Sequence, residues 1–168
     1  MNNYFLKALN QENEAPYIPV WLLRQAGRYM PEYREVRSQY KDFFEMIKKP
    51  EICKELTLQP LNAFDLDAAI TFTDILTIPD ALGLKVNFVK GKGPIFEKSL
   101  SSMDKLDLNT NEFHDKIQYV YSATSLIKEN VNVPLIGFTG SPWTLFVYMF
   151  YGQSPKDFKR IQSYISEN

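Results

Sequence analysis

Cysteine and histidine are almost absent from this chain of 168 residues, which holds one of each, Cys53 and His114. A single cysteine excludes a disulfide framework within the chain. One cysteine and one histidine also match none of the ligand spacings that are typical of structural zinc sites. The sequence therefore predicts no metal site and gives no sign of a bound cofactor.

Long apolar runs and a strong charge bias are missing as well. No apolar run approaches the roughly 20 residues of a membrane-spanning helix, and the N-terminus lacks the apolar core of a signal peptide. The formal net charge is −1, whereas nucleic-acid-binding domains usually carry a strongly basic patch. We therefore expect a cytoplasmic protein with neither a membrane nor a nucleic acid as its partner.

Arginine is scarce but concentrated. Only five of the 19 basic residues are arginines, and four of those five fall within residues 24–37, where no lysine occurs. A guanidinium presents a planar fork of donors that matches a carboxylate or phosphate with two hydrogen bonds and keeps its charge. Because Gly27 favours a loop between Arg24 and Arg28, we expect these two side chains to converge on one anionic ligand.

The other two arginines of this segment, Arg34 and Arg37, have a second interpretation. They fall in a predicted helix over residues 31–39, which begins with Pro31, a residue favoured at the first helical position. Glu32 and Glu35 lie in the same helix, so surface ion pairs are the interpretation that we favour for these two arginines.

Three apolar runs that do not alternate with polar residues predict buried strands. Helices are expected between and after them, which is typical of an α/β fold with a parallel sheet. The expected strands span residues 17–23, 66–72 and 133–138. The expected helices span residues 2–11, 31–39, 50–64 with a kink or early end at Pro60, 111–130, 142–151 and from 155 onward, with a hairpin over 84–98.

This order corresponds to about three βα units of a (β/α)8 TIM barrel. A complete barrel takes about 250 residues. We therefore expect residues 1–168 to form a single domain that is the N-terminal portion of such a barrel, in a fragment of a longer protein. In barrels of this kind the chemistry lies at the carboxyl ends of the strands, where Arg24, Asp74 and the loop around Ser141 are expected.

Two further residues are candidates for chemistry, each with an alternative. Asp74 follows the second expected strand, so its carboxylate is either aimed into a cleft or caps a following helix. The pattern does not separate it cleanly from Asp65, Asp67 and Asp80. Tyr148 lies in an apolar helix, where an aromatic ring packed in the core is the common role.

Two long motifs and one short segment resemble the uroporphyrinogen decarboxylase family. The pattern P-x-W-x-x-R-Q-A-G-R occurs as residues 19–28, and G-F-x-G-x-P-[W/F]-T occurs as residues 137–144. Between them, residues 72–79, Phe-Thr-Asp-Ile-Leu-Thr-Ile-Pro, resemble the family's aspartate segment. The three lie in family order and the resemblance covers essentially the whole chain.

The resemblance implies a carboxy-lyase that needs neither cofactor nor metal, folds as an α/β barrel and works as a homodimer. It removes carbon dioxide from the four acetate side chains of uroporphyrinogen III, giving coproporphyrinogen III for haem synthesis. By the same resemblance, Arg24 and Arg28, with Gln25 beside them, would hold substrate carboxylates and Tyr33 would line the pocket. Asp74 would face the pyrrole N–H groups, and Tyr148 would bond near the reacting acetate.

Two alternatives remain open at this point. The family also places a serine and a histidine from its C-terminal half in the site, and His114 does not match that histidine, so an inactive fragment or a non-catalytic module is one alternative. The other is a corrinoid-dependent methyltransferase of the same barrel superfamily. Those enzymes bind zinc through cysteine and histidine and have a degraded arginine motif, whereas the motif here is intact.

Overall fold

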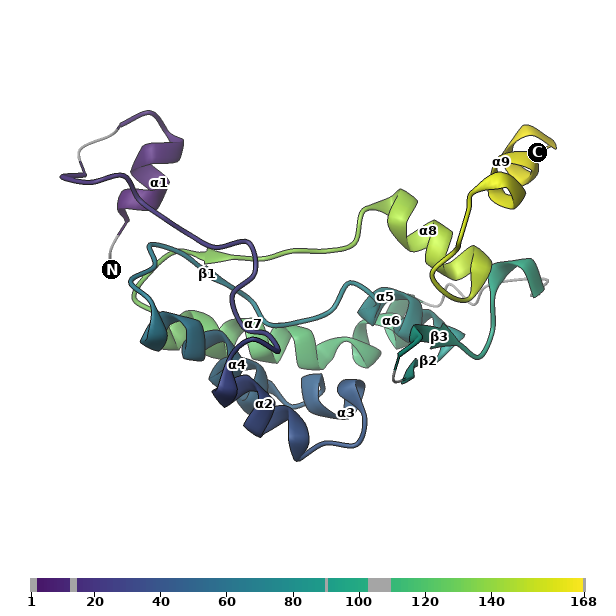
Figure 1. The fold of residues 1–168 in the computed structure, drawn as a ribbon, viewed down its shortest axis with the longest axis horizontal. Coiled ribbons are helices and arrows are strands. Elements are labelled where there is room, and N and C mark those ends of the chain that lie inside the picture. Colours follow the sequence, from purple (N-terminus) through teal and green to yellow (C-terminus); the bar gives the residue numbers. More distant parts are fainter. Residues whose placement is uncertain (1–2, 13–14, 90, 103–109, 168) are drawn as a thin grey trace. The chain divides into compact units, whose positions relative to one another are not determined.

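The computed structural model describes residues 3–12, 15–89, 91–102 and 110–167 (Figure 1). The chain forms two compact units. Unit 1 comprises Met1–Thr73 and Gln118–Phe138, and unit 2 comprises Asp74–Ile117 and Thr139–Asn168. Unit 2 therefore interrupts unit 1 in the sequence.

Unit 1 combines helices with a short parallel sheet. Its helices are α1 (Tyr4–Leu9), α2 (Pro31–Ser38), α3 (Phe43–Ile47), α4 (Pro50–Ala63) and α7 (Gln118–Asn130), and its strands are β1 (Ala69–Ile70) and β4 (Leu135–Ile136). The strands pair in parallel, with Ala69 opposite Leu135 and Ile70 opposite Ile136. Helix α4 packs against α7, beside which it runs in Figure 1, and it also contacts β1. The predicted parallel sheet is confirmed for the second and third apolar runs.

The buried face of α4 follows from its residue spacing. Cys53, Leu56, Thr57 and Pro60 are buried at positions i, i+3, i+4 and i+7, the spacing of one helical face. The Thr57 hydroxyl donates to the Cys53 carbonyl at 2.8 Å and accepts the backbone N–H of Phe72 at 3.0 Å. This face therefore ties the helix to the chain that follows β1. The early end expected at Pro60 is wrong, because the helix continues to Ala63.

The strand predicted over residues 17–23 is wrong. These residues are in no strand, and Ile18 and Leu23 are about four-fifths exposed. The segment is instead held by Asp67, whose carboxylate accepts the Tyr17 hydroxyl at 2.6 Å and the Val20 backbone N–H at 2.8 Å. The Asp67 N–H donates in turn to the Val20 carbonyl at 2.8 Å. The apolar run thus lies against the start of β1 without continuing its ladder.

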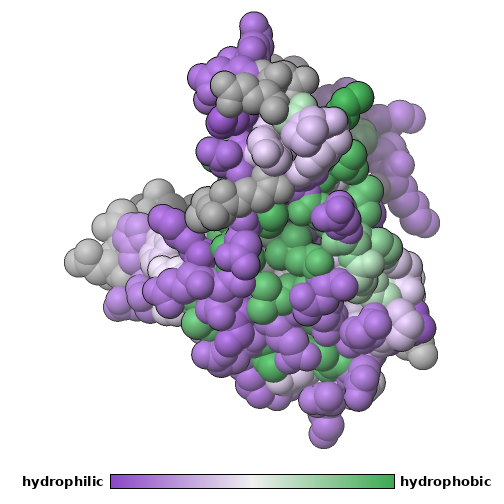
Figure 2. Space-filling view, turned by 90° about the vertical axis from the view of Figure 1, so that its left-hand side faces the viewer, coloured by the Kyte–Doolittle hydropathy of each residue, from purple (hydrophilic) through white to green (hydrophobic). Residues whose placement is uncertain are grey.

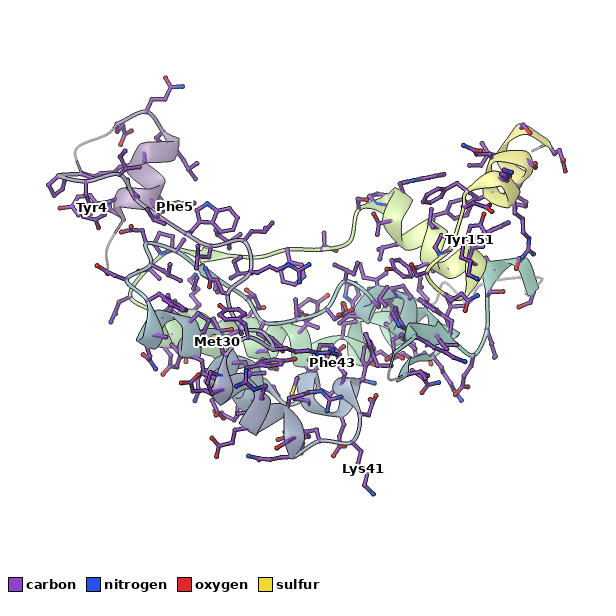
Figure 3. The ribbon with its side chains drawn as sticks, viewed as in Figure 1. Tyr4, Phe5, Met30, Lys41, Phe43 and Tyr151 are labelled. Atoms are coloured by element: carbon purple, nitrogen blue, oxygen red, sulfur yellow. The ribbon has the colours of Figure 1, made fainter. Side chains whose placement is uncertain are left out.

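Side chains anchor the two ends of the N-terminal part of unit 1. Tyr4 and Phe5 of α1 meet the rings of Tyr17 and Trp21 edge-on, with centroids 5.7 and 6.3 Å apart. Figure 3 shows these two labelled side chains on α1 and, further along, Lys41 pointing away from the ribbon. The ring of Phe43, also labelled there, lies 6.4 Å from that of Phe72.

Helix α3 was not expected from the sequence. Its first turn is capped by Asp42, whose carboxylate accepts the backbone N–H of Glu45 at 3.1 Å. Phe44, Met46 and Ile47 are buried on it. The Asp-x-x-Glu spacing of residues 42–45 is the capping signal that predicts such a start.

Unit 2 contains a hairpin and several short helices. Its elements are α5 (Thr77–Pro79), the turn η1 (Asp80–Leu84), β2 (Val86–Val89), β3 (Gly93–Phe96), the turn η2 (Leu100–Ser102), α6 (Thr110–Lys116), α8 (Pro142–Tyr151) and α9 (Lys159–Glu167). Strands β2 and β3 pair antiparallel, with Val86 opposite Phe96, so the predicted hairpin is confirmed. Gly91 and Gly93 have φ values of 80° and 82°, which only glycine adopts readily.

A cluster of apolar residues forms the centre of the C-terminal part of unit 2. Val147, Phe150 and Ile161 are buried there, and Tyr151 packs against them. The Tyr151 hydroxyl accepts the backbone N–H of Ile161 at 3.2 Å, which fixes the start of α9 on α8. The predicted helices over 142–151 and beyond 155 are confirmed, whereas the one predicted over 111–130 is interrupted at Ile117.

The fold is mixed α/β, as the sequence predicts. Within the described ranges, none of the helices has both the length and the apolar character that crossing a bilayer requires.

Candidate functional site

A pocket of about 400 Å³ lies at the carboxyl ends of β1 and β4 in unit 1. Three parts of the chain meet at it: the loop after the first apolar run, the residues that follow β1, and Phe138, which follows β4. We call it the arginine pocket. It is lined by Leu23, Arg24, Gln25, Ala26, Gly27, Arg28, Tyr29, Thr57, Pro60, Ile70, Thr71, Phe72, Thr73 and Phe138.

The two arginines predicted to hold an anion both line this pocket. Arg24 and Arg28 are exposed, and among the described residues neither guanidinium has a carboxylate within ion-pair distance. A guanidinium without an acidic partner at a pocket wall keeps its donors available for a bound anion. The structure therefore brings the two candidates together at one cavity.

Gln25 plays a different part from its arginine neighbours. Its side chain is buried, with 4% exposed. Its Nε2 donates to the Ala68 carbonyl at 2.8 Å, and its Oε1 accepts the Ile70 N–H at 3.0 Å. The amide thus bonds β1 as a neighbouring strand would, and it fixes the arginine loop to the sheet.

Tyr29 and Arg34 close the arginine loop from its other end. The Tyr29 hydroxyl donates to the backbone carbonyls of Gln25 and, at 3.5 Å, Arg24. The Nη1 of Arg34 donates to the carbonyls of Arg28 and Tyr29, at 2.8 and 3.0 Å. These bonds hold the backbone that carries the two pocket arginines.

The ion pairs favoured for Arg34 and Arg37 are wrong. Arg34 bonds the loop carbonyls, and Arg37 Nη1 donates to the Tyr40 carbonyl at 2.5 Å. Backbone carbonyls at a loop and at a helix end are acceptors held in fixed positions. An exposed ion pair contributes little to stability in water, so the arginines bond the carbonyls instead.

Tyr33 lies outside the lining of the arginine pocket. Its ring packs 5.9 Å from that of Phe72, and the side chain is buried. Burial raises the pKa of the Tyr33 hydroxyl, and the nearby charges of Arg37 and Arg28 partly offset that rise. The structure thus places Tyr33 behind Phe72, and its role as a pocket wall stays a prediction.

The structure separates Asp74 from the other aspartates that the sequence left equivalent. Asp67 is bonded to Tyr17 and Val20, Asp65 is exposed, and Asp80 accepts the Val86 N–H at 3.2 Å. Asp74 is half-buried in unit 2.

The local turn uses only part of the Asp74 carboxylate. Its Oδ1 accepts the Leu76 N–H at 2.8 Å, and its backbone carbonyl accepts the Thr77 hydroxyl at 3.0 Å. Burial raises the pKa of the Asp74 carboxyl, and the bond from Leu76 opposes the rise. No bond to Oδ2 is recorded within the described part of the chain, so that oxygen is available to a ligand. Asp74 is not the N-cap of the following helix, because Leu76 has that position in α5 and the Asp74 carboxylate bonds its N–H. The alternative, a charge aimed into a cleft, stays a prediction.

Tyr148 lies on α8 in unit 2 and is half-buried. Its ring stacks on Phe96 of β3, with centroids 6.5 Å apart and planes 24° apart. Its hydroxyl makes no hydrogen bond to any described residue. The ring thus has the packing role common for a helical aromatic, while the hydroxyl is left for another partner.

The start of α8 explains two residues of the second motif. The Ser141 hydroxyl caps the helix by accepting the Thr144 N–H at 3.3 Å. At Gly140 a Cβ atom would lie 2.7 Å from Cγ of Leu145 and 3.3 Å from Cβ of Ile75. A larger residue at this position would force the side chain of Leu145 to move.

Sequence reasoning missed several pocket residues, notably Thr71 and Phe138. Phe138 is part of the second motif, and its 44% exposure puts an aromatic face at the pocket. Thr71 is buried, yet its Oγ1 has no hydrogen-bond partner within the described part of the chain. The sequence does not predict this hydroxyl, because one threonine in an apolar run leaves the strand prediction unchanged.

The family model described as uroporphyrinogen decarboxylase (URO-D) matches residues 1–168. A uroporphyrinogen decarboxylase of Vibrio campbellii is 49% identical over 166 residues, covering 96% of this chain and 46% of that protein. One of Francisella tularensis subsp. novicida is 45% identical over 171 residues, covering 100% of this chain and 49% of that protein. The chain spans about half the length of the curated relatives it matches.

Among solved structures, a methyltransferase from Methanosarcina mazei is similar, with a TM-score of 0.63 and 19% identity. The match covers 97% of this chain and 46% of that protein. At this identity the likeness concerns the fold alone.

Proposed function

Because the chain belongs to the uroporphyrinogen decarboxylase family, we propose that it supplies the N-terminal part of a carboxy-lyase acting on uroporphyrinogen III. The product would be coproporphyrinogen III, formed by loss of carbon dioxide from four acetate side chains. In this proposal the chain forms the first part of a (β/α)8 barrel, and the assembled protein is a cytoplasmic homodimer without a resident cofactor.

One observation carries the proposal: two arginines that have no acidic partner among the described residues line a single pocket at the carboxyl ends of paired parallel strands. A substrate with eight carboxylates calls for such donors, since guanidinium–carboxylate bonds are both strong and directional. Active sites of α/β barrels lie at this end of the strands. Leu23, Ala26, Phe72 and Phe138 add apolar surface for a tetrapyrrole ring.

The reaction needs an electron sink, which the pyrrole ring itself provides. Protonation of the ring carbon that bears the acetate makes the ring cationic. The bond to the carboxylate carbon then breaks, its electron pair returns to the ring, and carbon dioxide leaves. A second proton then adds to the side-chain carbon, which becomes the methyl group, and the proton first added to the ring carbon leaves, which restores the neutral pyrrole.

We assign Asp74 to the cationic intermediate. A fixed carboxylate near the pyrrole N–H groups stabilises the positive charge as it forms, and loss of one such preorganised group typically costs about 2.7–4 kcal/mol of barrier. Its raised pKa reflects removal from water, which also strengthens its interaction with a cation. Tyr148 would donate a hydrogen bond near the reacting acetate.

Anaerobic turnover of uroporphyrinogen III tests the proposal, with products separated by carboxylate number. The chain would be assayed alone and mixed with the C-terminal half of the Vibrio campbellii relative. We expect the mixture to form the seven-carboxylate intermediate and coproporphyrinogen III. A folded, stoichiometric complex that releases no carbon dioxide would rule the proposed activity out.

A further inference from the structure

Thr71 comes directly after β1 and is buried, with 4% of the residue exposed. Its backbone N–H donates to the Ile136 carbonyl at 3.0 Å, which extends the pairing with β4. Its Oγ1, in contrast, makes no hydrogen bond within the described ranges. Hydrophilic side chains cover much of the face shown in Figure 2, where water can bond to them. The Thr71 oxygen has almost no surface exposed to water.

An unpaired hydroxyl in this position opposes folding of the free chain. A buried polar group gives up its bonds to water, and without a replacement bond that loss is not offset. Valine has nearly the same shape as threonine, fits an extended strand equally well and carries no hydroxyl. The packing of unit 1 therefore favours valine at this position, and a polar group kept at the expense of stability is typical of a binding site.

Thr57 is a satisfied hydroxyl in the same pocket and shows the difference. It is also buried and lines the arginine pocket. Its hydroxyl donates to the Cys53 carbonyl at 2.8 Å and accepts the Phe72 N–H at 3.0 Å, so both of its hydrogen-bonding roles are used within the chain. Of these two threonines, Thr71 is the one whose hydroxyl is left for a ligand.

The arginine pocket brings the Thr71 hydroxyl into the company of cations. Arg24 and Arg28 line the same cavity of about 400 Å³, and neither has an acidic partner among the described residues. A carboxylate has two oxygens with about four sites for accepted hydrogen bonds, of which a guanidinium fork occupies two. A carboxylate bound to an arginine there still has room for a hydroxyl donor.

Thr71 also borders a second cavity, a groove of about 380 Å³ between β4 and α7. Its walls include the apolar side chains of Val120, Val131 and Leu135, and Lys128 is the charged residue in its lining. Two guanidinium groups attract an anion more strongly than one ammonium group, and they bind it at two points. The arginine pocket is therefore the better source of a partner for this hydroxyl.

We infer that the Thr71 hydroxyl donates a hydrogen bond to the ligand carboxylate that Arg24 and Arg28 hold, which makes Thr71 a further substrate-binding residue. The inference rests on the proposed function and adds a neutral donor to its anion site. Because the oxygen is withdrawn from the surface, the side chain would turn about χ1 from one staggered position to another to meet the ligand. The hydroxyl thus lowers stability in the free chain and contributes affinity in the complex.

Titration calorimetry of the chain with two probes tests the inference. The probes are uroporphyrin III and trimesate, a benzene tricarboxylate that has no pyrrole ring. Thr71→Val should weaken binding of both by about tenfold or more, and Thr71→Ser, which keeps the hydroxyl, should stay within about twofold of the parent. Thr124→Val is the matched control, because its hydroxyl donates to the Val120 carbonyl at 2.8 Å and lies outside the arginine pocket.

Stability and coupling separate binding from a structural role. Thr71→Val should raise the urea midpoint for unfolding of unit 1, whereas loss of a hydroxyl that is bonded in the free chain would lower it. In a double-mutant cycle with Arg24→Lys, the two losses of affinity should not add, because both side chains bind one carboxylate.

Each opposite result would overturn the inference. Parent-like affinity of Thr71→Val for both probes would do so while leaving the proposed function untouched. A lower urea midpoint for this variant would show that the hydroxyl already has a partner, and additive losses in the cycle would place its partner in the groove between β4 and α7. Trimesate binding that depends on Thr71, without binding of uroporphyrin III, would instead refute the proposed substrate and support the inference. A parent chain that binds neither probe would refute both.

Discussion

The side-chain amide of Gln25 bonds Ile70 as a strand neighbour would, with the Ile70 N–H 3.0 Å from Oε1. The same amide donates to Ala68 on the other side of Ala69. One residue thus links the loop that carries Arg24 and Arg28 to the strand at whose end the arginine pocket lies. The position of both guanidinium groups therefore depends on a neutral side chain between them.

Gln25→Leu should destabilise unit 1 by about 2–4 kcal/mol, because it leaves the Ala68 carbonyl and the Ile70 N–H buried without partners. The measurement is a urea titration in which unfolding of unit 1 is monitored by the reactivity of the buried Cys53 thiol. Gln39→Leu is the matched control, since Gln39 is exposed at the end of α2 and should change stability by less than about 0.5 kcal/mol. Similar costs for both variants would show that the Gln25 bonds contribute nothing.

Cys53 should resist thiol reagents while unit 1 is folded. Its Sγ donates to the Ile47 carbonyl at 3.1 Å, and burial raises its pKa to about 12. Only the thiolate reacts, so labelling by iodoacetamide at pH 8 should be at least about 100-fold slower than in urea. Fast labelling of the folded chain would contradict the buried position.

The same pKa predicts a loss of stability in alkali. Because the folded-state pKa of Cys53 lies above its unfolded value of 9.0, the folded chain keeps a proton that the unfolded chain releases. The stabilisation present below pH 9 is therefore lost as the pH rises towards 12. Cys53→Ala should remove this part of the pH dependence, which paired urea titrations at pH 8 and 10.5 would measure.

Arg24→Lys should lower ligand affinity without changing stability, whereas Arg34→Lys should lower stability. Arg24 has no acidic partner among the described residues, so its replacement should leave stability unchanged and lower the affinity for uroporphyrin III about tenfold, through loss of a two-point bond. Arg34 bonds two loop carbonyls, so its replacement should cost about 1 kcal/mol of stability. Fluorescence titration with uroporphyrin III and urea unfolding give the two quantities, and equal loss of affinity in both variants would contradict the assignment.

The sequence predicted those parts of the fold whose signal is local. Pro31, Pro50 and Pro142 mark helix starts correctly, because the proline ring fits the first helical turn in any surroundings. The strand predicted over residues 17–23 is wrong because side chains from distant parts of the sequence replace strand pairing there. The carboxylate of Asp67 binds the Val20 N–H, and the amide of Gln25 binds the edge of β1.

The candidate site was likewise predictable only in part. Guanidinium chemistry and loop position sufficed to bring Arg24 and Arg28 to one pocket. The hydropathy pattern could not single out Asp74 from Asp65, Asp67 and Asp80. These carboxylates differ in the backbone and side-chain groups that the fold brings near them. The role of Thr71 was equally unpredictable. Its hydroxyl has no partner among the described residues because the fold brings no donor or acceptor near it, and the sequence does not show this.

Asp74→Asn should stabilise unit 2 near neutral pH while abolishing turnover in the assembled protein. The folded-state pKa of the Asp74 carboxyl is raised above 3.8, so the contribution of Asp74 to stability is greatest below pH 3.8 and is lost as the carboxyl ionises at higher pH. Asparagine keeps the acceptor for the Leu76 N–H without the buried charge. The gain in unfolding free energy should therefore shrink as the pH falls towards 3.8.

Asp157→Asn is the matched control for this variant. Asp157 also accepts the N–H two residues ahead, from Lys159 at 3.1 Å, but it is exposed. It should change neither turnover nor the pH dependence. Fluorescence of Trp143 in a Trp21→Phe background reports on unit 2, and an Asp74→Asn variant with full turnover would remove Asp74 from the reaction.

Tyr148→Phe and Tyr151→Phe separate catalysis from packing on one helix. The Tyr148 ring would keep its stack on Phe96, and its hydroxyl has no partner among the described residues, so unit 2 should unfold within about 0.5 kcal/mol of the parent. Tyr151→Phe removes the acceptor of the Ile161 N–H and should cost about 1 kcal/mol. In turnover the order should reverse, because only the Tyr148 hydroxyl is proposed to reach the substrate. A Tyr148→Phe variant that is destabilised yet fully active would assign this residue to packing alone.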